Sequence, residues 1–128
     1  MGAEFTFYDY VDHQGRNLVD SWLQADVTKM VKEKFNEQLT YLEATPIGMW
    51  DRPYAAPVGD SLFEIRVVNF GQHYRILGTH TPGGKPTLLE CFVKRDKKIP
   101  PENRTRAIGR REDVLADPIH RRTEHSYE

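Results

Sequence analysis

The chain has 128 residues, and its eighteen Lys and Arg residues nearly balance its nineteen Asp and Glu residues, giving a formal net charge of −1. This length predicts one domain with a core of its own, and the near-neutral charge argues against indiscriminate binding of nucleic acid. No apolar run is long enough to span a membrane, and the single cysteine, Cys91, predicts a core thiol in a reducing cytoplasm rather than a disulfide.

The chain is expected to begin with a strand over residues 4–11. Within it, Phe5 and Phe7 lie on one face because side chains alternate between the two faces of a strand. The sequence Asp-His-Gln-Gly at residues 12–15 predicts a turn after this strand.

Two helices are expected next. Asn17 is a suitable N-cap for a helix over residues 18–24, with Leu18 and Trp22 facing inward and Val19 and Leu23 as further candidates for the inward face. Asp26 is expected to cap a second, longer helix. Apolar residues of this second helix, which ends near Glu43, recur at helical spacing and predict packing on a sheet: Val27, Met30, Val31, Phe35, Leu39 and Leu42.

Residues 44–60 contain three prolines and two glycines, which predicts a loop without regular structure. Trp50 and Tyr54 lie in this loop. They could stack on a nucleic-acid base, but packing on the body of the domain is the commoner fate of such side chains.

Residues 62–98 predict a three-stranded antiparallel meander, because three apolar-rich runs are separated by turn sequences at residues 69–72 and 81–84. One face of this meander is expected to be apolar and to pack on the helices: Phe63, Ile65, Val67, Tyr74, Ile76, Leu89, Cys91 and Val93.

The register of the meander follows from its first turn. A two-residue turn places Val67 opposite Tyr74 and Arg66 opposite Arg75, whereas a slip by one residue would mismatch the apolar faces. Facing arginines repel each other and are not required by a fold, so their presence indicates function. The face that carries them is expected to be open to solvent and holds these residues: Glu64, Arg66, His73, Arg75, Glu90, Phe92 and Lys94.

The region after the meander is basic. Residues 94–111 include eight Lys or Arg residues and only two acidic ones. A proline pair predicts the start of a helix over residues 102–115, and the polar residues 116–128 are expected to fray. The expected domain therefore spans residues 1–115, followed by a C-terminal tail.

The expected element order, β-α-α-β-β-β-α, predicts an α+β fold. Its helices should pack on one face of a small antiparallel sheet. No spacing typical of a metal site and no glycine-rich phosphate loop is found in the sequence, so neither metal nor cofactor is expected.

Arginine clusters suit phosphate, because their forked donors match its oxygens and stay charged. Cleavage of RNA can use the substrate's own 2′-hydroxyl as the attacking group, so a face of Arg and Lys can serve a ribonuclease that needs no metal. Phe92 offers a surface on which a base could stack.

The run LFEIRVV, YRIL, LLECFVKRDKKIPPENRTRAIGRRED resembles the phage-derived toxin branch of the RelE/HigB superfamily of type II toxin–antitoxin systems. The front of the chain, FTFYDYVDHQGRNLVDSWLQ, is similar to the first strand, glycine turn and first helix of that family. The resemblance covers roughly residues 5–115 and implies a RelE-like fold.

The resemblance further implies a cytoplasmic toxin that cleaves mRNA on the ribosome and is restrained by a small helix-turn-helix antitoxin. Arg66 and Arg75 match the strand arginines that contact phosphate and stabilise the transition state. Lys94 and Arg95 match the basic pair at the end of the last strand. The expected contacts to RNA are Phe92, Lys97, Lys98, Arg104, Arg106 and Arg110.

The proton-transfer residue stays open at this point. Some relatives use a C-terminal tyrosine, but Tyr127 has no clear match, and Lys94, Lys97 and His73 are the candidates. Two other functions are also open: a gyrase poison of the same fold, and a non-catalytic or inactivated prophage module that binds RNA or protein.

Overall fold

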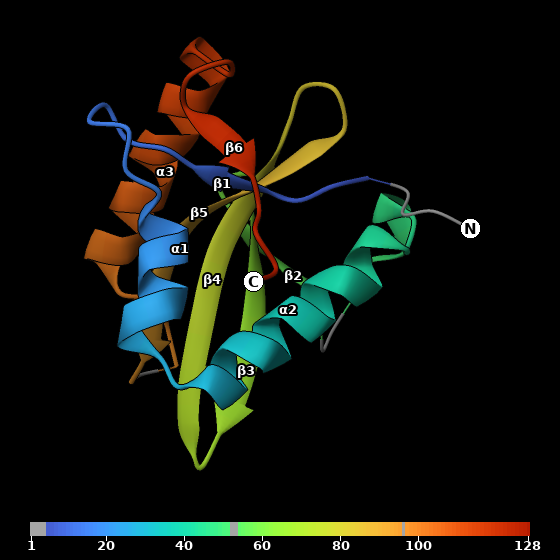
Figure 1. Ribbon diagram of the computed structural model, residues 1–128, viewed down its shortest axis with the longest axis vertical. Helices are drawn as coiled ribbons and strands as arrows, with labels where there is room; N and C mark the ends of the chain where they lie inside the picture. The colour runs from blue at the N-terminus through green and yellow to red at the C-terminus, as the bar shows by residue number, and fades with distance from the viewer. Residues whose placement is uncertain (1–4, 52–53, 96) are drawn as a thin grey trace.

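The computed structural model describes residues 5–51, 54–95 and 97–128 and shows an α+β fold, as predicted (Figure 1). Its strands form one sheet: β1 (Tyr8–Tyr10), β2 (Ala56–Gly59), β3 (Leu62–Asn69), β4 (Gln72–Thr81), β5 (Lys85–Lys94) and β6 (Arg122–Glu124). Its helical elements are α1 (Leu18–Ser21), the π-helical turn η1 (Trp22–Asp26), α2 (Lys29–Glu43), the 3₁₀ turn η2 (Ile47–Met49) and α3 (Pro101–Ala116).

The sheet has the strand order β2-β3-β4-β5-β1-β6, and every neighbouring pair is antiparallel except β1 with β5. The expected meander is confirmed as β3, β4 and β5. Its first turn contains Phe70 and Gly71, both at positive φ (50° and 77°). This turn sets the predicted register, in which Val67 pairs with Tyr74.

The first face of the sheet is covered by α1, η1 and α2, and α2 crosses in front of β3 in Figure 1. Four of the six expected core residues of α2 are fully buried, but Met30 is half-exposed. The predicted cap Asp26 was wrong, because this residue closes η1, and the side chain of Thr28 instead accepts a hydrogen bond from the Val31 N–H at 3.2 Å. In the preceding helix, the candidates Val19 and Leu23 are buried, Trp22 packs partly buried against the same core, and Leu18 is only partly buried.

The predicted apolar face of β5 was wrong at Leu89, because β4 and β5 pair around a β-bulge. The register shifts between Leu77 and Gly78, so that Leu77 pairs with Glu90 and Gly78 with Leu88. Because the extra residue of a bulge displaces the alternation, Leu88 joins the core beneath α2 and Leu89 packs on the opposite side of the sheet.

The second face was expected to be open, and this expectation was wrong over much of its area. The predicted C-terminal helix is confirmed as α3, and its Ala107 and Val114 are fully buried. They form a second core with apolar residues of the sheet: Tyr10, Leu62, Leu77, Leu89 and Phe92. The open part of this face is therefore confined to the end beyond α3, where β3 turns into β4.

The expected loop at residues 44–60 contains structure that the sequence did not predict. The segment holds η2 and an edge strand, β2, which pairs with the start of β3. The packing interpretation of Trp50 is confirmed, because its ring lies 5.5 Å from that of Phe7 and 5.4 Å from that of Phe63. Tyr54 stacks on Tyr41 of α2 at a centroid distance of 4.3 Å.

The expected frayed tail instead forms β6, which pairs with β1. Beyond it, the ring of His125 is fully buried, with Nδ1 2.8 Å from Asp9 Oδ1 and Nε2 2.9 Å from Asn36 Oδ1. The first strand, β1, spans three residues and is shorter than the predicted strand over residues 4–11. The first residue of that predicted strand, Glu4, lies outside the described residues. None of the helices in the described ranges is long and apolar enough to cross a bilayer.

Candidate functional site

The candidate site is a set of charged side chains at the open end of the second sheet face. Three cross-strand rows build it from β3, β4 and β5, since residues paired across strands share a face. The rows contain Val68, His73 and Lys94, then Arg66, Arg75 and Phe92, then Glu64, Leu77 and Glu90. The structure therefore brings four of the five predicted catalytic residues together, Arg66, His73, Arg75 and Lys94, and Arg95 follows directly after β5.

Glu64 is the centre of this arrangement and has only 1% of its surface exposed. Its Oε1 lies 3.1 Å from Arg66 Nη2 and 3.3 Å from Arg75 Nε. The Nζ of Lys94 lies 4.0 Å from Oε2. One buried carboxylate thus faces three cations, which explains how two arginines can pair across adjacent strands despite their repulsion.

Arg75 is buried, and its donors are directed into the protein. Its Nη1 donates to the carbonyl of Tyr74 at 3.1 Å, and its Nη2 lies 3.4 Å from Nδ1 of His73. Burial lowers the pKa of the Arg75 guanidinium below its ordinary value, and the charge of Glu64 opposes this effect. Arg66, with 30% of its side chain exposed, and Lys94, with 14%, form the side of the cluster that solvent reaches.

The imidazole of His73 lies beside Arg75, with its Nδ1 3.4 Å from Nη2 of the guanidinium. His73 is exposed, so its ring is accessible to a group bound at the cluster.

The predicted RNA contacts Lys97 and Lys98 are exposed and, with the predicted catalytic residue Arg95, follow the end of β5. The three predicted RNA contacts on α3 already have carboxylate partners: Arg104 pairs with Asp60, and both Arg106 and Arg110 pair with the buried Glu90.

Phe92 is only 7% exposed and packs in the second core, so the expected stacking surface is not available. Tyr127, for which the sequence shows no clear match, follows β6, and burial together with the nearby Glu43 of α2 raises the pKa of its hydroxyl above the ordinary value. Because α2 covers the other face of the sheet, Tyr127 is remote from the arginine cluster.

The role of Glu64 is the main feature that the sequence did not predict. The alternation of β3 placed it on the correct face beside Arg66, and this spacing was the available signal. Its buried position depends on side chains of the neighbouring strands, Arg75 and Lys94 among them, which the local sequence does not indicate.

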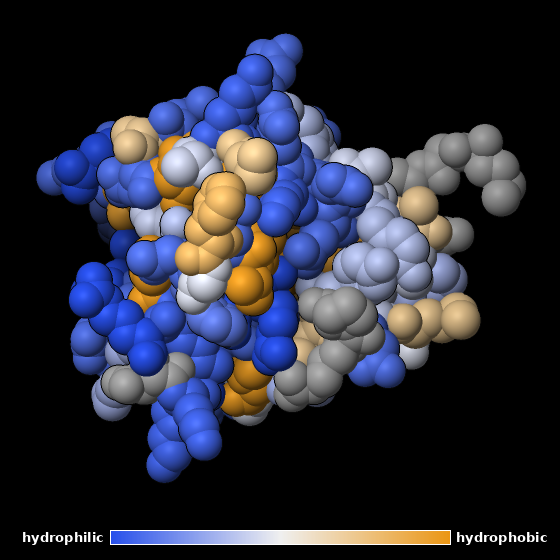
Figure 2. Space-filling view, turned by 90° about the horizontal axis from the view of Figure 1, so that it is seen from below, coloured by the Kyte–Doolittle hydropathy of each residue, from blue (hydrophilic) through white to orange (hydrophobic). Residues whose placement is uncertain are grey.

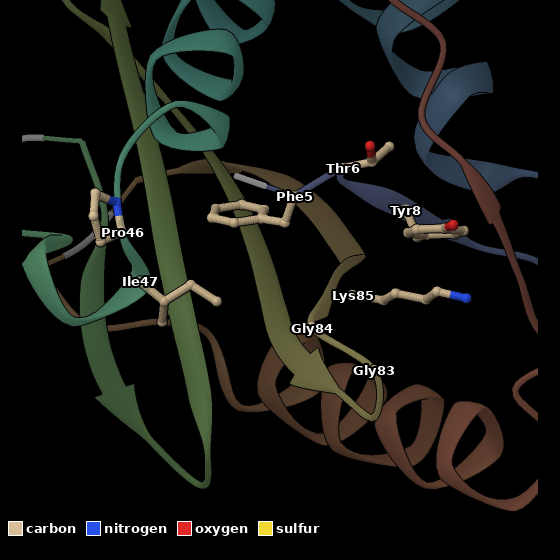
Figure 3. Close-up of a pocket in the computed structure, with 8 residues that line it drawn as sticks. All are labelled: Phe5, Thr6, Tyr8, Pro46, Ile47, Gly83, Gly84 and Lys85. Atoms are coloured by element: carbon tan, nitrogen blue, oxygen red, sulfur yellow. The ribbon is translucent and has the colours of Figure 1, made fainter. Parts of the chain in front are cut away.

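The end of the molecule that carries the β3–β4 turn is largely hydrophilic, with separate small hydrophobic patches (Figure 2). A different hollow of about 470 Å³ lies between the start of the chain, η2 and the β4–β5 turn, with Phe5, Ile47 and Lys85 in its wall (Figure 3). Lys85 begins β5 and Lys94 ends it, so this hollow is separate from the charged cluster. Within the described ranges, no group of three or more His, Cys, Asp or Glu residues could hold a metal ion.

Chemically, the cluster can bind an anion at a surface formed by Arg66, Lys94 and His73. Fixed donors that do not reorganise are what a developing negative charge requires. In a comparison with protein families, the model of the phage-derived protein Gp49-like family matches residues 22–112. The chain belongs to the Gp49-like family.

The Gp49-like family is a toxin-like family of the RelE/HigB type, which agrees with the resemblance seen in the sequence. The matched residues run from η1 almost to the end of α3 and include the whole charged cluster. None of the curated proteins compared with the chain matches it. A toxin of this type has an antitoxin partner in general.

Proposed function

We propose that this Gp49-like protein is the toxin of a type II toxin–antitoxin system and that it cleaves mRNA on the ribosome without a metal ion. The observation that supports this proposal most is the group of three cations held around Glu64 at the open end of the sheet. A phosphodiester gains negative charge on its oxygens during cleavage, and fixed Arg and Lys donors stabilise that charge.

In the proposed reaction the 2′-oxygen of the substrate attacks the adjacent phosphorus, and the bond from phosphorus to the 5′-oxygen breaks. The products are a 2′,3′-cyclic phosphate and a 5′-hydroxyl. Arg66 and Lys94 contact the phosphate oxygens. Arg75, which is buried beside them, contacts His73 and adds positive charge that stabilises the negative charge on the phosphate. We assign the acceptance of the 2′-hydroxyl proton to His73 and the donation of a proton to the leaving 5′-oxygen to Lys94; these two residues are cross-strand neighbours.

The partners in this proposal are mRNA, the ribosome and a small helix-turn-helix antitoxin. Arg95, Lys97 and Lys98 provide the contacts to RNA beside the cluster, since their charges are exposed. Arg104, Arg106 and Arg110 mainly stabilise the docking of α3, because each has a carboxylate partner. Binding to RNA should weaken steeply with salt, and an affinity that does not depend on salt would count against an RNA partner.

The test is induced expression of the wild-type chain and of two variants. Wild-type protein should arrest growth, and Arg66→Ala should relieve the arrest while the protein still accumulates. Lys85→Ala is the matched control, because it removes a cation from the far end of β5 and should leave the arrest intact. Continued growth with abundant folded wild-type protein would refute the proposal.

Mapping of cellular mRNA by primer extension during the arrest separates the proposal from the gyrase alternative. New mRNA 5′ ends that are missing in Arg66→Ala support cleavage. Growth arrest with intact mRNA and damaged DNA would assign the chain to gyrase instead.

A further inference from the structure

β3 has an outer edge that is only partly paired. On this outer side, the adjacent strand β2 pairs with Leu62, Phe63 and Glu64, and no described strand pairs with the outer edge of β3 at residues 65–69. An exposed strand edge is a template for another strand, because its backbone groups have no other regular partner.

The two-residue turn determines which backbone groups face outward. In such a hairpin Asn69 and Gln72 form a hydrogen-bonded pair, and alternate pairs repeat this pattern. The N–H and C=O groups of Arg66 and Val68 therefore point away from β4, toward the free edge. Within the described ranges, neither of these N–H groups has an acceptor.

Side chains of α2 reach the same edge. The amide nitrogen of Gln38 donates to the Arg66 carbonyl at 3.0 Å, and the Nζ of Lys34 lies 3.4 Å from the Val68 carbonyl. The other amide atom of Gln38, Oε1, is shielded from solvent but has no hydrogen-bond partner. The edge thus offers two backbone donors and one buried side-chain acceptor without partners.

A groove of about 470 Å³ runs beside this edge. Tyr41 and Tyr54, which stack on each other, form its apolar wall and are 51% and 37% exposed. Val68, on the other side of the strand, is 49% exposed. At the end of the edge Phe70 is 92% exposed at a φ of 50°, a conformation that bulky residues rarely adopt.

We propose that the free edge of β3 at residues 65–69 receives an extended segment of a partner protein as an added strand, with acidic side chains toward Arg66 and apolar or aromatic side chains toward Tyr41 and Tyr54. Side chains of an added strand alternate between the two faces of the sheet, so such a segment meets both surfaces at once. The inference is independent of whether the charged cluster cleaves RNA.

The charges of the edge favour this occupant over a second copy of the chain. Two copies paired through this edge would bring Arg66 and Lys34 of each copy close to the same cations of the other, and like charges across strands are destabilising. An acidic strand instead adds a carboxylate beside Arg66, which shares the single carboxylate of Glu64 with Arg75 and Lys94. It also gives the free N–H groups of Arg66 and Val68 the carbonyl acceptors that they lack.

The probe is a capped synthetic peptide of seven residues, with glutamate at alternate positions and valine or tyrosine between them. The measurement is amide hydrogen exchange in the full chain, residue by residue, by NMR. Without peptide, the amides of Arg66 and Val68 should exchange fast, and those of Val67 and Asn69 slowly. With the peptide at roughly 1 mM, exchange at Arg66 and Val68 should slow by about tenfold or more.

Val68→Pro removes the outward N–H without removing a β3–β4 hydrogen bond, and proline is tolerated on edge strands. It should abolish binding of the peptide, and the matched control Val68→Ala should retain it. Arg66→Glu, which keeps the backbone donors, should reverse the preference to a peptide with lysine in place of glutamate. This second variant keeps the test decisive if Val68→Pro does not fold.

Three outcomes would overturn the inference: no slowing of exchange at Arg66 and Val68 at millimolar peptide, equal binding of the glutamate and lysine peptides by the wild-type chain, or slow exchange at these amides that depends on protein concentration alone. The last outcome would assign the edge to a second copy. None of these readouts depends on RNA cleavage, so failure here and failure of the proposed function are distinguishable.

Discussion

Replacement of Glu64 by glutamine should destabilise the protein strongly, because Glu64 is the anion that compensates buried Arg75. Breaking a buried ion pair by removing one partner costs about 3–5 kcal/mol, since the other charge stays buried. Glutamine keeps one carbonyl oxygen near the guanidinium, so the lower end of this range is expected. Arg66 and Lys94 can turn toward solvent and add at most about 1 kcal/mol each.

Urea denaturation followed by tryptophan fluorescence measures this change, since Trp22 and Trp50 pack against the first core. The expected loss is about 3 kcal/mol in the free energy of unfolding, which lowers Tm by roughly 12 °C for a domain of this size. Glu37→Gln, on the exposed side of α2, is the matched control and should change stability by less than about 0.5 kcal/mol. A loss below about 1 kcal/mol for Glu64→Gln would refute the claim that this carboxylate compensates a buried charge.

Three other predictions concern stability. Burial and a nearby carboxylate raise the pKa of Tyr10 to about 12, so the wild-type chain should lose about 2 kcal/mol relative to Tyr10→Phe between pH 10 and 12. Urea titrations at several alkaline pH values measure this loss, and parallel curves for the two proteins would contradict it. His125→Ala should cost about 3 kcal/mol, because it leaves the buried Asp9 carboxylate without its imidazole partner. Hydrogen exchange should then show faster opening of β6, whereas unchanged protection there would oppose a stabilising role. Gly78→Ala should cost about 2–3 kcal/mol, since a Cβ there would lie 2.5 Å from the ring of Phe63. Thermal unfolding measures that cost, and an unchanged Tm would be the contrary result.

The sequence predicted the parts of the fold that local pattern controls. The meander, its register and the pairing of Arg66 with Arg75 follow from alternation and a two-residue turn. The core stripe of α2 follows from helical spacing, although Met30 at its edge is half-exposed. The N-cap Asn17 is also confirmed, with its side chain accepting a hydrogen bond from the Asp20 N–H at 2.9 Å.

The parts that were missed depend on contacts between distant segments. β6 pairs with β1, and directly after it His125 contacts Asp9, 116 residues earlier in the chain. The short polar sequence of β6 gives no strand signal. β2 contains proline and glycine, which argue against a strand locally but are tolerated at an edge. The bulge that moves Leu89 to the other face also has no local sequence signal.

The residues of the site were predicted, but their burial was not. Alternation alone placed Arg66, His73, Arg75 and Lys94 on one face. It could not show that α3 covers the neighbouring part of that face. This packing buries Phe92 and pairs arginines of α3 with Glu90. Arg75 is accordingly a support for the exposed cations rather than a surface residue.

We propose that the cations around Glu64 stabilise cleavage of mRNA by its own 2′-hydroxyl. The most direct measurement incubates the purified chain with ribosomes carrying an end-labelled mRNA whose A-site codon is vacant, and identifies the ends of the products. We expect a 2′,3′-cyclic phosphate and a 5′-hydroxyl, loss of cleavage with Arg66→Ala, and no cleavage when the attacking nucleotide is 2′-deoxy. Cleavage of the deoxy-substituted mRNA, or full activity of Arg66→Ala, would contradict this proposal.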